Sequence, residues 1–93
     1  MTTEAKRHET VEAFLQTGEV GDWAFTEDNA YICIETPGGT AILPIDPTVS
    51  AKHNTPCWTW DGSREAPTLT PSILHHGNPE WHGYMTKGKL VTV

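Results

Sequence analysis

The sequence predicts a small, mainly β domain of the α+β class: an antiparallel sheet, a sandwich or a partly open barrel, with one N-terminal helix. A chain of 93 residues is long enough for one domain but only for a modest core. Four tryptophans offset a hydrophobic fraction of 37%, because one aromatic ring buries about 150–250 Å². After Gly18, short runs rich in Val, Ile, Thr and aromatic residues alternate with turn residues, which is typical of antiparallel strands.

Helical patterning is confined to the N-terminal end. Val11, Phe14 and Leu15 fall at positions i, i+3 and i+4 and form one apolar stripe. The stripe predicts a helix over residues 9–17, which must dock on other elements because it is short. Residues 1–8 are polar, and we expect them to fray.

The β part of this single domain (residues 1–93) spans residues 23–93. Turn residues divide it into seven candidate strands: Trp23–Phe25, Ala30–Glu35, Thr40–Leu43, Cys57–Trp60, Thr68–Leu74, Trp81–Thr86 and Lys89–Val93. Pro37-Gly38-Gly39 and Lys87-Gly88 each predict a hairpin, since glycine readily takes the positive φ of tight turns. A two-residue turn at Lys87-Gly88 would pair Met85 with Leu90, whereas a longer, bulged turn would shift the pairing by one residue.

The run Thr68–Leu74 alternates between two faces. Leu69, Pro71 and Ile73 share one face, and the hydroxyl residues between them share the other. Because Pro71 has no N–H to donate, this strand either lies at a sheet edge or breaks at a bulge.

Hydroxyl groups beside tryptophans could form a shallow polar binding site, or they could simply be the solvent side of a half-exposed strand. The expected ligand-binding residues are Trp58, Trp60, Asp61, Thr68, Thr70, Ser72, His82 and Tyr84. Such a face could stack aromatic groups and donate several hydrogen bonds, which would suit a nucleotide or an added peptide strand.

Three histidines, His75, His76 and His82, are the candidate metal ligands because they lie close together in the sequence. Their spacing matches no standard pattern, and the two cysteines, Cys33 and Cys57, form no CxxC pair. We therefore expect neither a metal nor another cofactor, and we expect both thiols to be reduced.

Sequence motifs give little support to catalysis. The chain has no G-x-S-x-G, Walker or G-x-G-x-x-G motif. Ser72 with a nearby histidine and Asp61 could form a triad, but a triad is defined by geometry, which the sequence does not supply. The sequence therefore favours a non-enzymatic protein.

The charge and hydropathy of the chain limit the kinds of partner that it could bind. A formal charge of −6 disfavours direct nucleic-acid binding, which needs a basic surface. The sequence contains no signal peptide and no apolar run of membrane-spanning length, so we expect a cytoplasmic protein without membrane contact. Both a monomer and a homodimer are compatible with exposed strand edges.

The motif Trp-x-Trp-Asp-Gly, followed by Pro-Thr-x-x-Pro-Ser-Ile and His-x-Tyr-Met, resembles a small domain family found in phages and prophages. The family has no established function, and some members carry a misleading ammonia monooxygenase label. The resemblance covers about residues 30–93. The matching residues are Trp58, Trp60, Asp61, Gly62, Pro67, Thr68, Pro71, Ser72, Ile73, His82, Tyr84, Met85, Gly88 and Leu90.

This chain departs from that family at its cysteines. Relatives carry a Cys-Pro-x-Cys-like knuckle and a cysteine before the downstream histidine, a pattern that implies zinc. Here Thr36-Pro37-Gly38-Gly39 stands at the knuckle, Trp81 precedes His82, and the cysteine-bearing tail of many relatives is missing after Val93. The resemblance implies the fold and a viral origin, and we expect packing around Trp81 to replace the zinc.

Three functions are compatible with these features. The leading one is a bacteriophage accessory protein of the host cytoplasm that binds a host protein or a small, nucleotide-like ligand and counters host defence. The second is an acidic inhibitor that mimics nucleic acid. The third is a small hydrolase that uses His82 with Asp61 or Ser72.

Overall fold

The computed structural model describes residues 2–3, 6–54 and 56–93. The elements of this part, in chain order, are β1 (Thr2–Thr3), α1 (Val11–Thr17), β2 (Trp23–Phe25), β3 (Tyr31–Thr36), β4 (Gly39–Pro44), α2 (Pro47–His53), β5 (Thr59–Trp60), β6 (Leu69–Thr70), β7 (Ile73–His75), β8 (Trp81–Thr86) and β9 (Lys89–Thr92). Neither helix of this part has the length and apolar character needed to cross a lipid bilayer.

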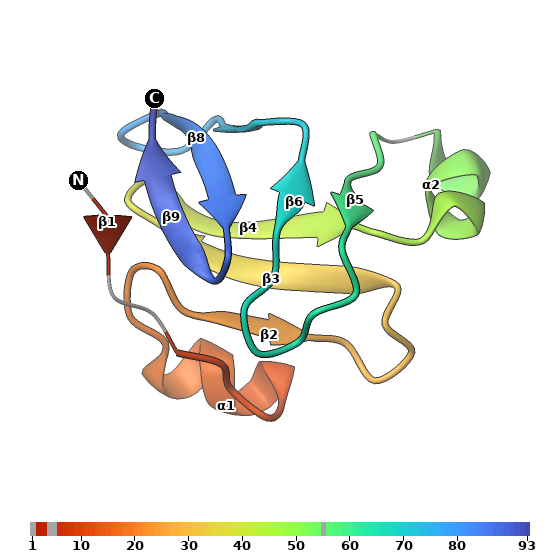
Figure 1. Cartoon of the computed structure of the whole chain (residues 1–93), viewed down its shortest axis with the longest axis horizontal. Helices are drawn as coiled ribbons and strands as arrows, with labels where there is room; N and C mark the ends of the chain where they lie inside the picture. Colours follow the sequence, from red (N-terminus) through yellow and green to blue (C-terminus); the bar gives the residue numbers. More distant parts are fainter. Residues whose placement is uncertain (1, 4–5, 55) are drawn as a thin grey trace.

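The described strands form three antiparallel sheets. One has four strands in the order β1-β9-β8-β7, one has three in the order β2-β3-β4, and β5 pairs with β6 alone. In Figure 1, β8 and β9 lie in front of β3 and β4, α1 lies beneath β2, and α2 stands apart beyond β5. The predicted mainly β, α+β class is confirmed; the sheets face each other rather than close into a barrel.

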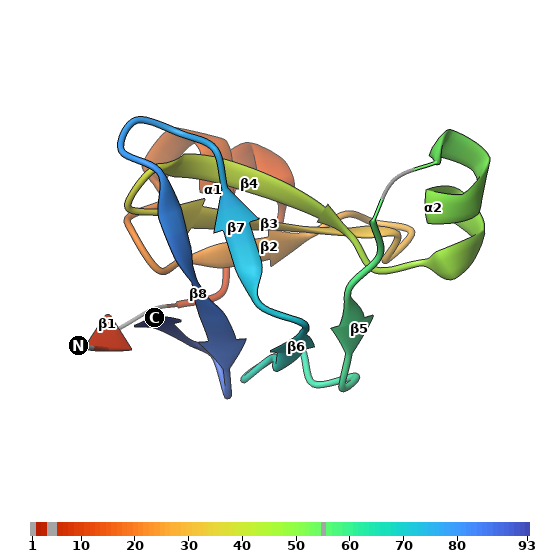
Figure 2. The ribbon, with the colours of Figure 1, turned by 90° about the horizontal axis from the view of Figure 1, so that it is seen from above.

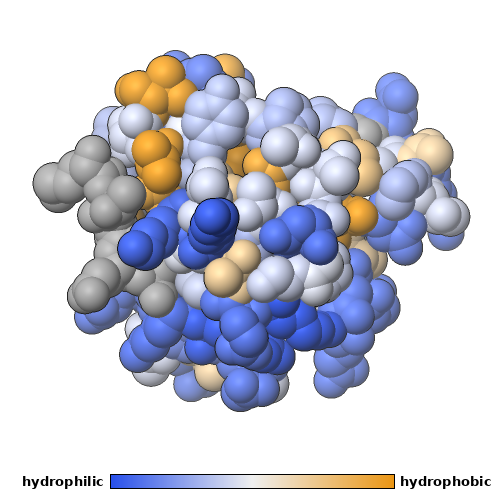
Figure 3. Space-filling view, viewed as in Figure 1, coloured by the Kyte–Doolittle hydropathy of each residue, from blue (hydrophilic) through white to orange (hydrophobic). Residues whose placement is uncertain are grey.

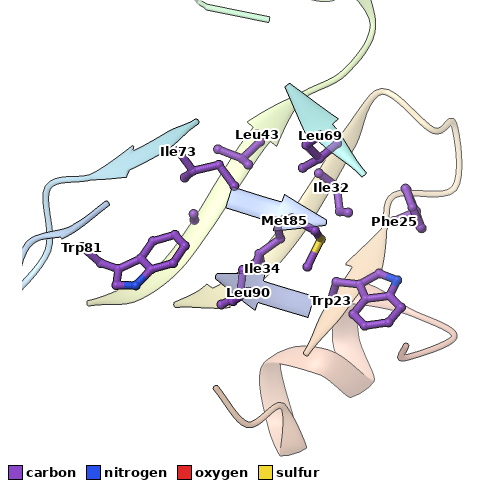
Figure 4. Close-up of a cluster of buried hydrophobic side chains, with 11 residues drawn as sticks. Trp23, Phe25, Ile32, Ile34, Leu43, Leu69, Ile73, Trp81, Met85 and Leu90 are labelled. Atoms are coloured by element: carbon purple, nitrogen blue, oxygen red, sulfur yellow. The ribbon is translucent and has the colours of Figure 1, made fainter. Parts of the chain in front are cut away.

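The main core lies between the four-stranded and the three-stranded sheet. Ile32 and Ile34 from β3 meet Met85 from β8, and all three side chains are fully buried. Figure 4 shows Leu69, Ile73, Trp81 and Leu90 in the same buried cluster as Met85. Alternate inward positions of opposed strands supply these side chains, as expected for two packed sheets.

A second, smaller cluster joins α1 to the outer face of the three-stranded sheet. Phe14 packs there with Ala24 and Cys33, all of them buried. The helix begins after Thr10, whose side chain accepts a hydrogen bond from the N–H of Ala13. Leu15, expected in the apolar stripe, is instead 65% exposed, because the short helix buries a narrower face.

Both predicted hairpins are confirmed. In the first, Thr36 pairs with Gly39 across a two-residue turn. In the second, Met85 pairs with Leu90, which selects the two-residue turn over the bulged one. Lys87 has a φ of 48° and Gly88 one of 77°, the left-handed pair that a type I′ turn requires.

Helix α2 was not expected, because Pro44 and Pro47 are residues typical of turns. Pro47 in fact occupies the first turn of the helix, where its missing N–H does no harm. Asp46 caps the helix through the N–H of Thr48, and Asn54 ends it in a left-handed conformation.

Residues 1–8 were expected to fray, but their described part is paired. Strand β1 pairs with β9, and Arg7 forms a bridge with Trp23. His8 is buried. Residues 1 and 4–5 lie outside the described part of the chain.

Candidate functional site

The chain changes sheets at Pro71 and Ser72. Thr70 ends β6, which pairs with β5, and Ile73 begins β7, which pairs with β8. Leu69 and Ile73 are buried as expected. Pro71 is exposed and does not share their face, because the strand breaks there and its alternation is interrupted.

This break presents Ser72 to a histidine. The Oγ atom of Ser72 lies 3.0 Å from Nε2 of His82. Leu74 pairs with His82 and Ile73 with Gly83, so Ser72 and His82 are diagonal neighbours on the outer face of β7 and β8. Figure 2 shows these two strands side by side. His82 is exposed and Ser72 half-buried, so both side chains are accessible to a substrate.

Apolar side chains surround the pair on this outer face. His82 lies between Leu74 on β7 and Val93, whose N–H donates to the carbonyl oxygen of His82. Tyr84 is the next outward residue of β8, and it pairs with Val91. Figure 3 shows hydrophobic surface near the C-terminal end of β9, whereas the surface around α1 is hydrophilic.

Packing on the inner face of β8 keeps His82 and Tyr84 on its outer face. Gly83 points inward between His82 and Tyr84, and a Cβ atom there would lie 2.4 Å from Cζ2 of Trp81. The buried Trp81 ring therefore covers this glycine, and its Nε1 donates to the hydroxyl of Thr92.

Trp58 holds the backbone of Ser72 from the other side. Its Nε1 donates to the carbonyl oxygen of Ser72 at 3.3 Å. Its own N–H donates to the carbonyl oxygen of Pro44 at 2.9 Å. The indole thus links Ser72 to the end of β4.

Ser72 is distinct among the three serines of the chain. The hydroxyl of Ser50 bonds to the carbonyl of Pro56, and that of Ser63 accepts from the N–H of Ala66. Only the hydroxyl of Ser72 is bonded to an imidazole among the residues described. A serine hydroxyl within hydrogen-bond reach of a histidine is the arrangement that activates a nucleophile.

No carboxylate of the described residues bonds to His82. Asp61, the sequence-based candidate for a third member, accepts hydrogen bonds from the N–H groups of Ser63 and Thr68. It sits at the end of the β5–β6 pair opposite to Ser72. The geometry is therefore that of a Ser–His dyad.

The other candidates for ligand binding do not gather around this dyad. Trp60 packs on Phe25, with 4.8 Å between the ring centroids. The hydroxyl of Thr68 accepts from the N–H of Lys87, and Thr70 is exposed at the end of β6. Of the eight residues proposed from the sequence, Trp58, Ser72, His82 and Tyr84 are the ones that the fold brings together.

The candidate metal ligands are also dispersed. His76 lies 2.8 Å from Glu80, whereas His82 bonds to Ser72. The described residues contain no group of three or more His, Cys, Asp or Glu side chains that could hold a metal ion. Both cysteines are free, and burial raises the pKa of the Cys33 thiol, which disfavours the reactive thiolate.

A second histidine, His8, forms a buried pair with a carboxylate. Nε2 of His8 lies 2.8 Å from Oδ2 of Asp22. Burial by itself would raise the pKa of Asp22, but hydrogen bonds from the Glu19 N–H, the His8 ring and the Lys6 N–H lower it below 3.8. No sequence pattern predicts this pair, because the two residues lie in segments without any motif.

The family described as "Bacterial ubiquitination-like system serine protease (BubE)" matches residues 10–93. No curated protein matches the chain, and no solved structure does. Because the match spans most of its length, this chain belongs to the BubE family.

Membership of this family corrects several expectations. A small domain family was expected and is found, but its description names a bacterial system, which does not support the viral origin. It also names a serine protease, so the expected non-enzymatic binding role, the nucleic-acid mimic and the absence of catalysis are overturned. A ubiquitination-like system does agree with the expectation of protein partners.

Proposed function

Because the chain belongs to the BubE family, we propose that it is a serine hydrolase in which Ser72 is the nucleophile and His82 the general base. The observation that supports this role is the 3.0 Å contact between the Ser72 hydroxyl and Nε2 of His82. Its substrate is an amide or ester bond of a protein in a bacterial ubiquitination-like system.

The arrangement supports acyl transfer in two steps. Ser72 Oγ attacks the substrate carbonyl carbon while its proton passes to Nε2 of His82, which must be unprotonated in the free enzyme. His82 then gives that proton to the leaving nitrogen or oxygen, and the acyl group remains on Ser72 as an ester. Water attacks the ester, again through His82, and releases the carboxylic acid.

The fold keeps both groups in place for this chemistry. The Trp58 indole holds the Ser72 carbonyl, and pairing with Leu74 sets the position of His82 along β8. Such fixed positioning supplies part of the rate enhancement because reacting groups need no reorientation.

A test needs no knowledge of the natural substrate. An alkyl fluorophosphonate reacts with an activated serine: the Oγ–P bond forms, the P–F bond breaks, and the proton passes to the histidine. We expect mass spectrometry to locate the adduct on Ser72, and Ser72→Ala to abolish it. His82→Ala should slow labelling by at least about a hundredfold, the scale of general-base catalysis.

Thr86→Ala serves as the matched control, since it removes an exposed hydroxyl from the same face of β8. It should leave labelling unchanged. An adduct on any other residue, or equal labelling of the His82→Ala protein, would contradict the proposed roles.

A further inference from the structure

The outer face of the four-stranded sheet carries an unusual share of the exposed apolar side chains. The described residues expose seven large hydrophobic side chains, and four of them belong to this face: Leu74, Tyr84, Val91 and Val93. Isolated exposed apolar residues are normal, but a contiguous group generally marks an interaction site.

The strand register arranges these side chains around the dyad. Leu74 and Val93 flank His82 on its two neighbouring strands. Ser72 lies one residue beyond the Ile73–Gly83 pair, which places it level with the Tyr84–Val91 pair. The apolar side chains thus form two rows, and each row contains one member of the dyad.

We propose that this face, made of Leu74, Tyr84, Val91 and Val93, is the platform that binds the substrate chain, and that it selects apolar side chains within two residues of the scissile bond. This inference rests on the proposed function. The bond to be cleaved must approach Ser72 Oγ on this outer face, so the residues beside it must lie on the platform.

The composition of the platform sets the class of substrate. None of its four side chains is charged, although the whole chain carries a formal charge of −6. A charged side chain placed among these four would lose water without a charged partner among them. Lys89, the cation on the same face of β9, pairs with Thr86, at the far end of β8 from His82. A substrate segment with Leu, Val, Phe or Tyr near the scissile bond would instead bury apolar area on both sides.

Peptidyl diphenyl phosphonates test this selectivity. These reagents phosphonylate an active-site serine with loss of phenoxide, and the two residues next to phosphorus can be varied. We expect reagents with Leu or Phe at these positions to label Ser72 at least about tenfold faster than reagents with Asp, the usual scale for an apolar pocket.

Two variants of the platform test directly whether its side chains determine this selectivity. Leu74→Lys and Val91→Lys should each remove most of the preference for Leu over Asp, because each replaces an apolar contact with a cation that attracts the Asp reagent. Leu15→Lys is the matched control: this leucine is 65% exposed on α1, away from the platform, and its replacement should leave the preference intact. Labelling of Ser72 by the alkyl fluorophosphonate also shows that each variant is folded around this residue.

The outcomes separate the two proposals. If Ser72 reacts with neither reagent, the proposed function fails and this inference fails with it. If Ser72 reacts but does not distinguish Leu from Asp, or if the platform variants keep the preference, the inference alone is overturned. A concentration-dependent dimer in sedimentation velocity that Leu74→Lys and Val91→Lys both disrupt would assign the face to a second copy of the chain, which also overturns it.

Discussion

Trp58 and Ser72, which lie 14 positions apart in the sequence, are joined by a hydrogen bond from the indole Nε1 to the backbone carbonyl oxygen. The bond lies next to the Ser–His dyad without involving the reacting hydroxyl. Trp58 is therefore a positioning residue for Ser72.

Trp58→Phe should keep the apolar ring but lose this hydrogen bond. A net loss of about 1 kcal/mol corresponds to about fivefold slower labelling of Ser72 by the alkyl fluorophosphonate. Trp60→Phe is the matched control, because it removes a bond from Nε1 to the carbonyl of Ser63, away from the dyad. Equal effects of both variants on the labelling rate would show that Trp58 has no specific role.

The His8–Asp22 pair should matter for stability rather than for catalysis. Asp22 is 3% exposed and accepts hydrogen bonds from the N–H groups of Lys6 and Glu19 as well as from His8. Its removal leaves the buried His8 ring without its partner, so we expect Asp22→Ala to lower the free energy of unfolding by about 3–5 kcal/mol. Urea denaturation measures this change, and the exposed Glu27→Ala should stay within about 0.5 kcal/mol of the parent protein.

Asp22 also predicts a pH dependence of stability. Hydrogen bonds outweigh burial and hold its pKa below 3.8 in the folded state, so the unfolded chain binds its proton more readily as the pH falls. This contribution is fully present above about pH 5 and is lost as the pH falls through the folded pKa. Asp22→Asn should flatten the unfolding free energy between pH 5 and pH 3, measured by urea titration at each pH.

Part of that slope should remain in the Asp22→Asn protein. The pKa of Asp28 is also lowered, by hydrogen bonds from the Thr26 hydroxyl and the Ala30 N–H. A slope equal to that of the parent protein would contradict the role assigned to Asp22.

Truncation of two neighbouring residues of β8 should change the free energy of unfolding by very different amounts, because their side chains face opposite sides of the sheet. Met85 is fully buried in the core and Thr86 is exposed. Met85→Ala should lower the free energy of unfolding by about 2–5 kcal/mol, whereas Thr86→Ala should change it by less than about 0.5 kcal/mol. Thermal or urea unfolding distinguishes the two, and similar losses would mean that the alternation of β8 is wrong.

Local signals explain which parts of this fold were predictable. The turn at Lys87-Gly88 and the alternation of the strands around it are encoded within a few residues, so the sequence predicted the hairpin and narrowed its register to two alternatives. The structure selects the one that pairs Met85 with Leu90. Helix α2 was missed because Pro47 has two opposite meanings: it breaks a helix interior but suits a helix start.

The sequence by itself determined a small antiparallel domain, its two hairpins and the outward position of the residues between buried ones, since period and turn chemistry are local properties. It also contained Ser72 and His82 as candidates, but it could not bring them together. Only the tertiary structure decided that pairing, because it depends on a break at Pro71 and on the register of β7 against β8. A shift of one residue in that register would move one of the two side chains to the opposite face of the sheet. The dyad on which the proposed chemistry depends would then be lost.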